Sequence, residues 1–181
     1  MFWQISRFRI DLTQPQVMGI VNVTPDSFSD GGQHDSTQAA LAHCEQLLKE
    51  GATLLDIGGE STRPGAIALP VDEELERVLP IVRHAVSLGV PVSVDTYKPA
   101  VMQAVLDLGA DIINDIWALG WKGADGVTGA QLVAAHRTCG VCVMHMHRDP
   151  QTMQTAPMEG DVVRQVLSFL ELRTQALQGL G

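Results

Sequence analysis

Short apolar runs alternate with longer segments of helical period along this chain. The apolar runs show no regular polar alternation, so each fits a strand that is buried on both faces, as in a parallel sheet covered by helices. Five runs are predicted to form such strands: residues 17–22, 54–57, 92–95, 112–115 and 143–146. The alternating stretch 8–12 before them predicts a hairpin.

The segments between these strands carry apolar residues three and four positions apart, which predicts helices with one buried face. Asp35 or Ser36 is suited to cap the first helix, and Pro99 fits the first turn of the third. Pro80 lies inside the second helix, where we expect it to kink the helix or to split off its first turn.

Glycine follows four of the predicted helices, at a position that suits left-handed backbone. These residues are Gly51, Gly89, Gly109 and Gly140, with spacings of 38, 20 and 31 residues. A barrel of eight units in about 250 residues averages about 31 residues a unit. No G-x-G-x-x-G motif follows the first strand, so a dinucleotide-binding sheet lacks its usual support. The pattern therefore predicts an α/β fold of the TIM (β/α)₈ barrel type, incomplete here, with about five units present.

The composition narrows the classes of function. Among the 181 residues, 12 are basic and 21 acidic, which gives a formal net charge of −9. Non-specific nucleic-acid binding needs a basic face, so we expect no nucleic-acid partner. No apolar run approaches the roughly 18 residues of a membrane-spanning helix, and the first residues lack the apolar stretch of a signal peptide. We therefore expect a cytoplasmic protein with no membrane partner.

Cys139 and Cys142 match the C-x-x-C pattern. A redox pair needs its first cysteine at a helix amino terminus, where the dipole lowers the thiol pKa. Here the pattern lies at the end of a predicted helix and runs into a strand. We therefore interpret both residues as buried core cysteines rather than as redox or zinc ligands.

Polar residues recur at the carboxyl ends of the predicted strands. They are Asn22, Asp56, Asp95, Asn114, His145 and His147. In a barrel these ends surround the active site, so the pattern predicts one shared site. Asp56 also has a structural interpretation, in which it accepts backbone hydrogen bonds beneath the loop that follows it.

Two loops after the first strands add further candidate chemistry. Residues 22–32 are rich in oxygen ligands and turn residues, and residues 58–65 combine glycines, hydroxyls and Arg63. Backbone N–H groups and a guanidinium are what a loop needs to hold an oxyanion.

Taken together, these motifs resemble the dihydropteroate synthase family. The resemblance rests on the two loops and on the strand ends at 94–96, 114–115 and 144–146, and it extends from about Val17 to the last predicted helix. It implies a (β/α)₈ barrel that acts in folate biosynthesis. Such an enzyme joins 4-aminobenzoate to (7,8-dihydropterin-6-yl)methyl diphosphate, forming 7,8-dihydropteroate and releasing diphosphate.

The resemblance also implies roles for residues at the strand ends. Asn22 would be a ligand of Mg²⁺, which neutralises the leaving diphosphate. Asp95 and Asn114 would bind the pterin and act in catalysis, because a buried anion such as Asp95 stabilises positive charge that builds on the pterin methylene.

The two loops receive roles in the same way. Thr62 and Arg63 would meet the diphosphate and the aminobenzoate. Ser27 and Asp30 belong to a loop that the family closes over the substrate, which excludes water from a reactive cation.

Two pairs of residues receive simpler interpretations. His145 and His147 have the spacing of a metal pair on a strand, but the family pattern does not use them as ligands. Trp117 and Trp121 are interpreted as packing or lid residues rather than as stacking platforms.

The family pattern continues with further strand ends that carry lysine, arginine and histidine. The resemblance therefore implies one pterin-binding barrel domain over residues 1–181, truncated at its carboxyl end, and it leaves open a homodimer of the full-length protein. Two alternatives stand beside the synthase. One is an inactive fragment that acts at most as a pterin-binding module. The other is a pterin-dependent methyltransferase domain, which should lack both loops.

Overall fold

The structure, a computed structural model, describes residues 1–23, 32–63, 65–152 and 155–180. Five parallel strands form one sheet in which each strand pairs with the next along the chain. They are β3 (Met18–Asn22), β4 (Leu54–Gly58), β5 (Val92–Asp95), β6 (Ile112–Asp115) and β7 (Gly140–Val143). This order lacks the reversal that a doubly wound sheet shows at its switch point. The strand order follows the barrel prediction.

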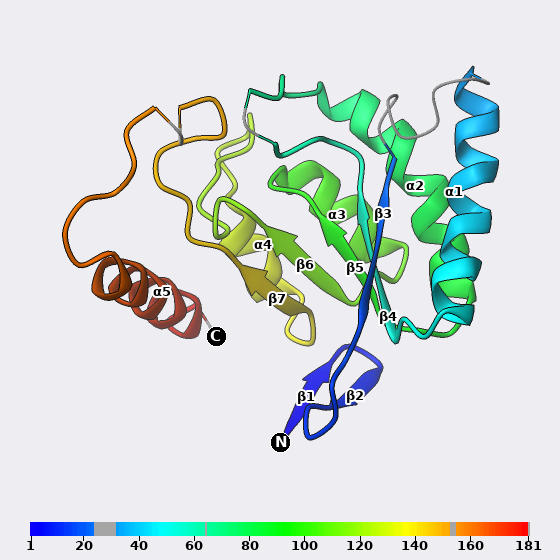
Figure 1. Cartoon of the computed structure of the whole chain (residues 1–181), viewed down its shortest axis with the longest axis horizontal. Helices are drawn as coiled ribbons and strands as arrows, with labels where there is room; N and C mark the ends of the chain where they lie inside the picture. The colour runs from blue at the N-terminus through cyan, green and yellow to red at the C-terminus, as the bar shows by residue number, and fades with distance from the viewer. Residues whose placement is uncertain (24–31, 64, 153–154, 181) are drawn as a thin grey trace.

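Helices connect the strands and cover the sheet. They are α1 (Gly32–Lys49), α2 (Val71–Ser87), α3 (Pro99–Asp107), α4 (Gly129–Ala135) and α5 (Val162–Gln178). Helices α1 to α4 lie along one face of the sheet, and α5 stands beyond β7 (Figure 1). The main core lies between these layers, where Leu55 and Val94 of the strands join Ile81 and Met102 of the helices. The chain therefore forms an incomplete α/β barrel.

An amino-terminal hairpin lies near the start of the core strands (Figure 1). It consists of β1 (Phe2–Ile5) and β2 (Phe8–Asp11), which pair antiparallel, as the alternating stretch predicts. Ile5 and Ile10 form a small second core with Leu54 and Ile112, the first residues of β4 and β6. The hairpin therefore covers the amino-terminal ends of these strands, opposite the edge where the polar residues gather.

The helix-ending glycines are confirmed at three of four positions. Gly51, Gly89 and Gly109 have φ angles of 106°, 74° and 99°, in the left-handed region. Gly140 is instead the first residue of β7, so that strand begins three residues earlier than predicted. A Cβ on Gly140 would lie 2.6 Å from Ile5 Cγ2, which shows that the hairpin packs against this backbone. The apolar run through residue 146 gave no signal for where the strand ends.

The predicted helix boundaries need two corrections. Helix α1 begins at Gly32, so neither Asp35 nor Ser36 is its cap. Helix α2 continues through Pro80 without losing its first turn. Pro80 has no N–H to donate to the carbonyl of Glu76, four residues earlier. Both residues are exposed, so water can bind that carbonyl instead. Pro99 does lie in the first turn of α3, as predicted.

Candidate active site

The carboxyl ends of the strands place four predicted positions in one row. In the parallel register Asn22 is opposite Gly58, Gly58 is opposite Asp95, and Asp95 is opposite Asn114. Side chains in register across a sheet share a face. We call these four residues the strand-end row. Its face is the one turned away from the apolar core, because the neighbours Val21, Ile57, Val94 and Ile113 belong to that core.

Gly58 leaves space in the middle of the strand-end row. A Cβ built on Gly58 would lie 3.6 Å from Asn22 Oδ1 and 3.8 Å from Asp95 Oδ2. The amide oxygen of Asn22 and the carboxylate of Asp95 therefore flank the same open backbone position. Both are hard oxygen donors, of the kind that Mg²⁺ prefers.

Asp56 lies two residues before Gly58 on the same face of β4. Asn114 Nδ2 donates a hydrogen bond of 3.2 Å to Asp56 Oδ2, while the buried Asp56 Oδ1 has no hydrogen-bond partner among the described residues. The expectation that Asp56 accepts backbone hydrogen bonds is therefore wrong. A buried acceptor without a partner is costly, so this oxygen is suited to a ligand that donates.

The strand-end row is electrostatically unusual. Burial raises the pKa of Asp95 to about 7, and the nearby carboxylates of Asp56, Asp115, Glu74 and Glu60 add to the rise. At neutral pH Asp95 is therefore close to half protonated. Perturbed carboxyl groups in a cleft are typical of functional sites, and this one favours ligands with N–H donors or positive charge.

Asp115 follows Asn114 but faces the other way. Its carboxylate accepts hydrogen bonds from the N–H groups of Trp117 (2.7 Å) and Leu119 (2.8 Å), which fixes the turn after β6. Burial raises the pKa of Asp115 to about 6, against the opposing effect of these two N–H groups and of Arg173. Asp115 therefore shapes the backbone next to Asn114 rather than the open face.

Thr62 and Arg63 lie on the loop after β4, and the structure does not bring them into the strand-end row. Thr62 lines a cavity of about 290 Å³. Arg63 is exposed and forms no ion pair with another described residue. The other residues that line this cavity are Glu60, Ser61, Ala66, Ala68, Tyr97, Ile116, Trp117, Trp121, Asp149, Pro150 and Gln151.

Three aromatic rings form one wall of this cavity. Trp121 lies with its ring centroid 5.1 Å from that of Tyr97 and 5.2 Å from that of Trp117. The two tryptophans thus pack against each other, as the packing interpretation expects, and they also face the cavity. The geometry makes the cavity largely apolar, with polar groups only from the loop and from residues 149–151.

The remaining predicted residues belong to the loop after β3 and to the segment after β7. Ser27 and Asp30 lie outside the described residues. His145 follows β7 and packs its ring against Phe169 of α5, with centroids 5.0 Å apart. No group of three or more His, Cys, Asp or Glu side chains that could hold a metal occurs in the described part of the chain.

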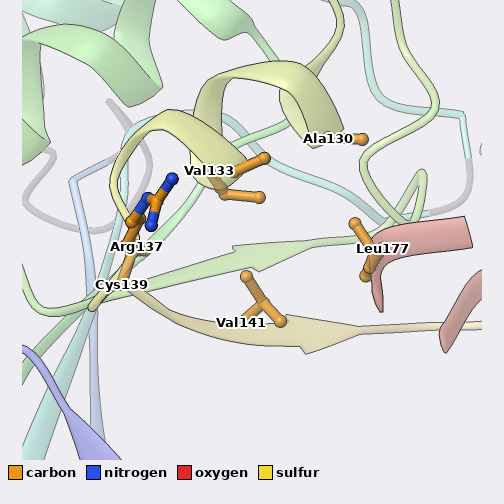
Figure 2. A pocket seen from close by; sticks show the side chains of 7 residues that line it. Ala130, Val133, Arg137, Cys139, Val141 and Leu177 are labelled. Carbon is orange, nitrogen blue, oxygen red and sulfur yellow. The ribbon is translucent and has the colours of Figure 1, made fainter. Parts of the chain in front are cut away.

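A second, smaller cavity of about 140 Å³ lies at the far side of β7, where Val133, Arg137, Cys139 and Leu177 meet (Figure 2). Burial raises the pKa of Cys139 to about 11, so its thiol stays protonated and unreactive near neutral pH. Cys139 is only partly buried, and Cys142 points to the open face of β7 and is exposed, so the prediction that both cysteines are buried in the core is met only in part by Cys139 and is wrong for Cys142. Alternation along an edge strand explains the difference.

The comparisons with known proteins agree with the fold. The sequence profile of the pterin binding enzyme family matches residues 18–181. The chain belongs to the pterin binding enzyme family. Among its relatives in that family, the dihydropteroate synthase of Neisseria meningitidis serogroup B is 50% identical over 174 residues. That alignment covers 95% of this chain and 59% of the relative, so the chain spans about three fifths of the relative's length.

Solved structures show the same fold for this family member. Dihydropteroate synthase of Burkholderia cenocepacia, complexed with 7,8-dihydropteroate, matches with a TM-score of 0.85 at 48% identity. The match covers 99% of this chain and 59% of that one. The enzyme of Xanthomonas albilineans with 4-aminobenzoic acid matches with a TM-score of 0.80 at 49% identity, covering 93% and 58%.

Sequence reasoning missed one set of buried charges next to the candidate site. Lys98 contacts both Glu60 and Glu74, although the three residues come from separate parts of the chain. The one local signal was a glutamate at an inward position of an amphipathic helix, since Glu74 lies four residues before the buried Val78.

No helix in the described residues is long and apolar enough to cross a membrane.

Proposed function

We propose that this chain carries the pterin half of a dihydropteroate synthase site. The observation that supports this most directly is the strand-end row, with the unpartnered Asp56 Oδ1 beside it. The relatives support the same activity, since one is a dihydropteroate synthase complexed with 7,8-dihydropteroate and another holds 4-aminobenzoic acid.

The row suits the chemistry of a pterin ring edge, which presents N–H donors beside a carbonyl acceptor. The carboxylates of Asp56 and Asp95 accept hydrogen bonds, and the amide of Asn114 can both donate and accept. The hydrogen bond from Asn114 Nδ2 to Asp56 fixes the amide so that its oxygen is free to face the ligand. These three side chains thus orient the ring within the open face of the sheet.

In the proposed reaction, the amine nitrogen of 4-aminobenzoate forms a bond to the pterin methylene carbon. The bond from that carbon to the diphosphate oxygen breaks, and the amine loses one proton. If the leaving group departs early, positive charge builds on the methylene and the attached ring. Asp95 in its ionised form, partly shielded from water, stabilises such charge. We place Thr62 and Arg63 at the diphosphate and the aminobenzoate.

The residues present fit Mg²⁺ as the metal. Asn22 Oδ1 and Asp95 Oδ2 flank Gly58, and a magnesium ion held by few protein oxygens leaves positions for diphosphate and water. When bound, the ion supplies positive charge to the leaving diphosphate. Asn22 is the residue that we propose as its protein ligand.

The test is binding and turnover with the purified chain. We expect the pterin diphosphate to bind in the presence of Mg²⁺ in isothermal titration calorimetry, and Asp95→Asn to weaken that binding at least about tenfold, the loss of one charge-assisted hydrogen bond. Diphosphate release on adding 4-aminobenzoate reports turnover. Absence of any pterin binding by the wild-type chain would refute the proposal.

Pterin binding without turnover is the second candidate. It is favoured by the position of Thr62 and Arg63, which the structure does not bring into the strand-end row. Pterin binding without diphosphate release would favour this second candidate over the synthase.

The motifs of both loops favour the synthase over a methyltransferase. A cytoplasmic location and a homodimer of the full-length protein stay predictions.

A further inference from the structure

A buried ion cluster lies beside the candidate site. Lys98 Nζ donates hydrogen bonds to Glu60 Oε2 and to Glu74 Oε2. The side chains of Lys98, Glu60 and Glu74 are only 8%, 9% and 1% exposed. We call these three residues the Lys98 cluster. Because a buried charge without a partner is strongly unfavourable, both carboxylates depend on the single ammonium that lies between them.

The Lys98 cluster joins three elements that carry the site. Lys98 immediately precedes α3 and lies three residues after Asp95, the end of β5. Glu74 lies in the first turn of α2. Glu60 lies in the loop between β4 and α2, two residues before Thr62. The ammonium therefore ties the Thr62 loop to the strand that ends in Asp95.

Glu60 also closes the loop on itself. Its Oε2 atom accepts a hydrogen bond of 2.9 Å from the N–H of Leu69, nine residues later. At the start of the loop, Arg77 Nη1 donates to the carbonyl of Gly59 at 3.1 Å. A Cβ on Gly59 would lie 2.7 Å from Val78 Cγ1, so the loop base rests directly on α2. Both ends of the segment 59–69 are thus fixed by side chains rather than by a sheet or a helix.

The same glutamate shapes the larger cavity. Glu60 lines it together with Ser61, Thr62 and Tyr97. Lys98 Nζ lies 5.1 Å from the centroid of the Tyr97 ring, so the ammonium contacts both the acidic and the aromatic wall. A shift of Glu60 would move the wall of the cavity and Thr62 with it.

We propose that Lys98 is a positioning residue, which holds Glu60 and through it the described residues of the segment 59–69 in place beside the larger cavity. The proposal rests on the proposed function in so far as Thr62 and Arg63 meet substrate. Its central claim concerns the loop itself, and ligand-free protein can test it.

The test is hydrogen–deuterium exchange of the ligand-free chain, followed by mass spectrometry of peptides from the segment 59–69 and from α3. Lys98→Met removes the ammonium. We expect amide exchange in the segment 59–69 to rise at least about tenfold, because the loop loses a charge-assisted hydrogen bond, while α3 stays protected. Lys98→Arg keeps the charge and should restore most of the protection. Lys49→Met, at a lysine that is 72% exposed, is the matched control.

A second variant guards against misfolding of Lys98→Met. Glu60→Leu removes the loop's anchor but leaves Lys98 paired with Glu74, so no buried charge loses its last partner. We expect the same local rise in exchange. Unchanged exchange in the segment 59–69 for both variants, or a rise of equal size in α3, would overturn the positioning role and leave a general contribution to stability.

Ligand binding then separates this proposal from the proposed function. Where the wild-type chain binds a pterin that carries no diphosphate, Lys98→Met should weaken 4-aminobenzoate binding to the pterin-loaded chain more than it weakens pterin binding, since the loop and not the row is displaced. An equal loss of affinity for both ligands would contradict this expected difference. A wild-type chain that binds neither ligand would refute the function, while the exchange data would still decide the role of Lys98.

Discussion

Replacing Asp95 by asparagine tests the electrostatics of the strand-end row. Burial and four neighbouring carboxylates raise the pKa of Asp95 in the folded chain to about 7, from 3.8. Between these values the unfolded chain releases a proton that the folded chain keeps. The charge of Asp95 therefore lowers the free energy of unfolding as the pH rises from about 4 to about 7.

The size of the effect follows from the shift. About three pKa units correspond to about 4 kcal/mol, at about 1.4 kcal/mol a unit. Asp95 is only partly buried, and water screens the exposed part, so we take half of this, about 2 kcal/mol. Asparagine has nearly the same shape and cannot ionise. Asp95→Asn should therefore raise the free energy of unfolding by about 2 kcal/mol at pH 8 and by only about 0.5 kcal/mol at pH 4.5.

Urea denaturation followed by circular dichroism at both pH values measures this difference. Glu171→Gln, at an exposed carboxylate of α5, is the control and should unfold as the wild-type chain does. The same stability change for Asp95→Asn at pH 4.5 and pH 8 would refute the electrostatic reasoning. A variant that is more stable yet binds pterin more weakly would show that the carboxylate is kept for its chemistry.

Three further predictions concern other residues. Asn22→Ala should weaken Mg²⁺-dependent binding of inorganic diphosphate about tenfold in calorimetry without changing the urea midpoint; unchanged binding would remove Asn22 as the metal ligand. Gly140→Ala should lower the free energy of unfolding by about 1–3 kcal/mol, because its Cβ would lie 2.6 Å from Ile5 Cγ2; wild-type stability would disprove this contact. Iodoacetamide at pH 8 should modify the exposed Cys142 before Cys139 and Cys44 in a mass-spectrometric time course, and the reverse order would contradict their burial.

The sequence was sufficient to predict the five core strands and most of the strand-end row. Parallel strands bring their carboxyl ends to one edge, so polar residues after separate apolar runs had to meet once the sheet was predicted. The predicted end of β7 was wrong. Residues 140–146 form one continuous apolar run, apart from His145, and this run contains no signal for a strand boundary.

Contacts between distant positions could not be predicted in this way. Asp56 and Asn114 are 58 residues apart, and their hydrogen bond depends on the register of β4, β5 and β6. The Lys98 cluster is harder still, since its members lie on a loop, a helix and a strand end. The local sequence gives only the inward position of Glu74, four residues before Val78, and the helical period does not say which cation this glutamate meets.

The amino-terminal hairpin has a consequence for the order in which the chain folds. β1 and β2 are synthesised first, but Arg7 pairs with Asp111, 104 residues later, and the N–H of Ser6 donates to the carbonyl of Thr138. Loops this long close slowly, so contacts of high sequence separation form late. A hairpin alone is marginally stable in water. It should therefore dock only after β6 and the turn before β7 are in place, so its docking reports that the segments around Asp111 and Thr138 have folded.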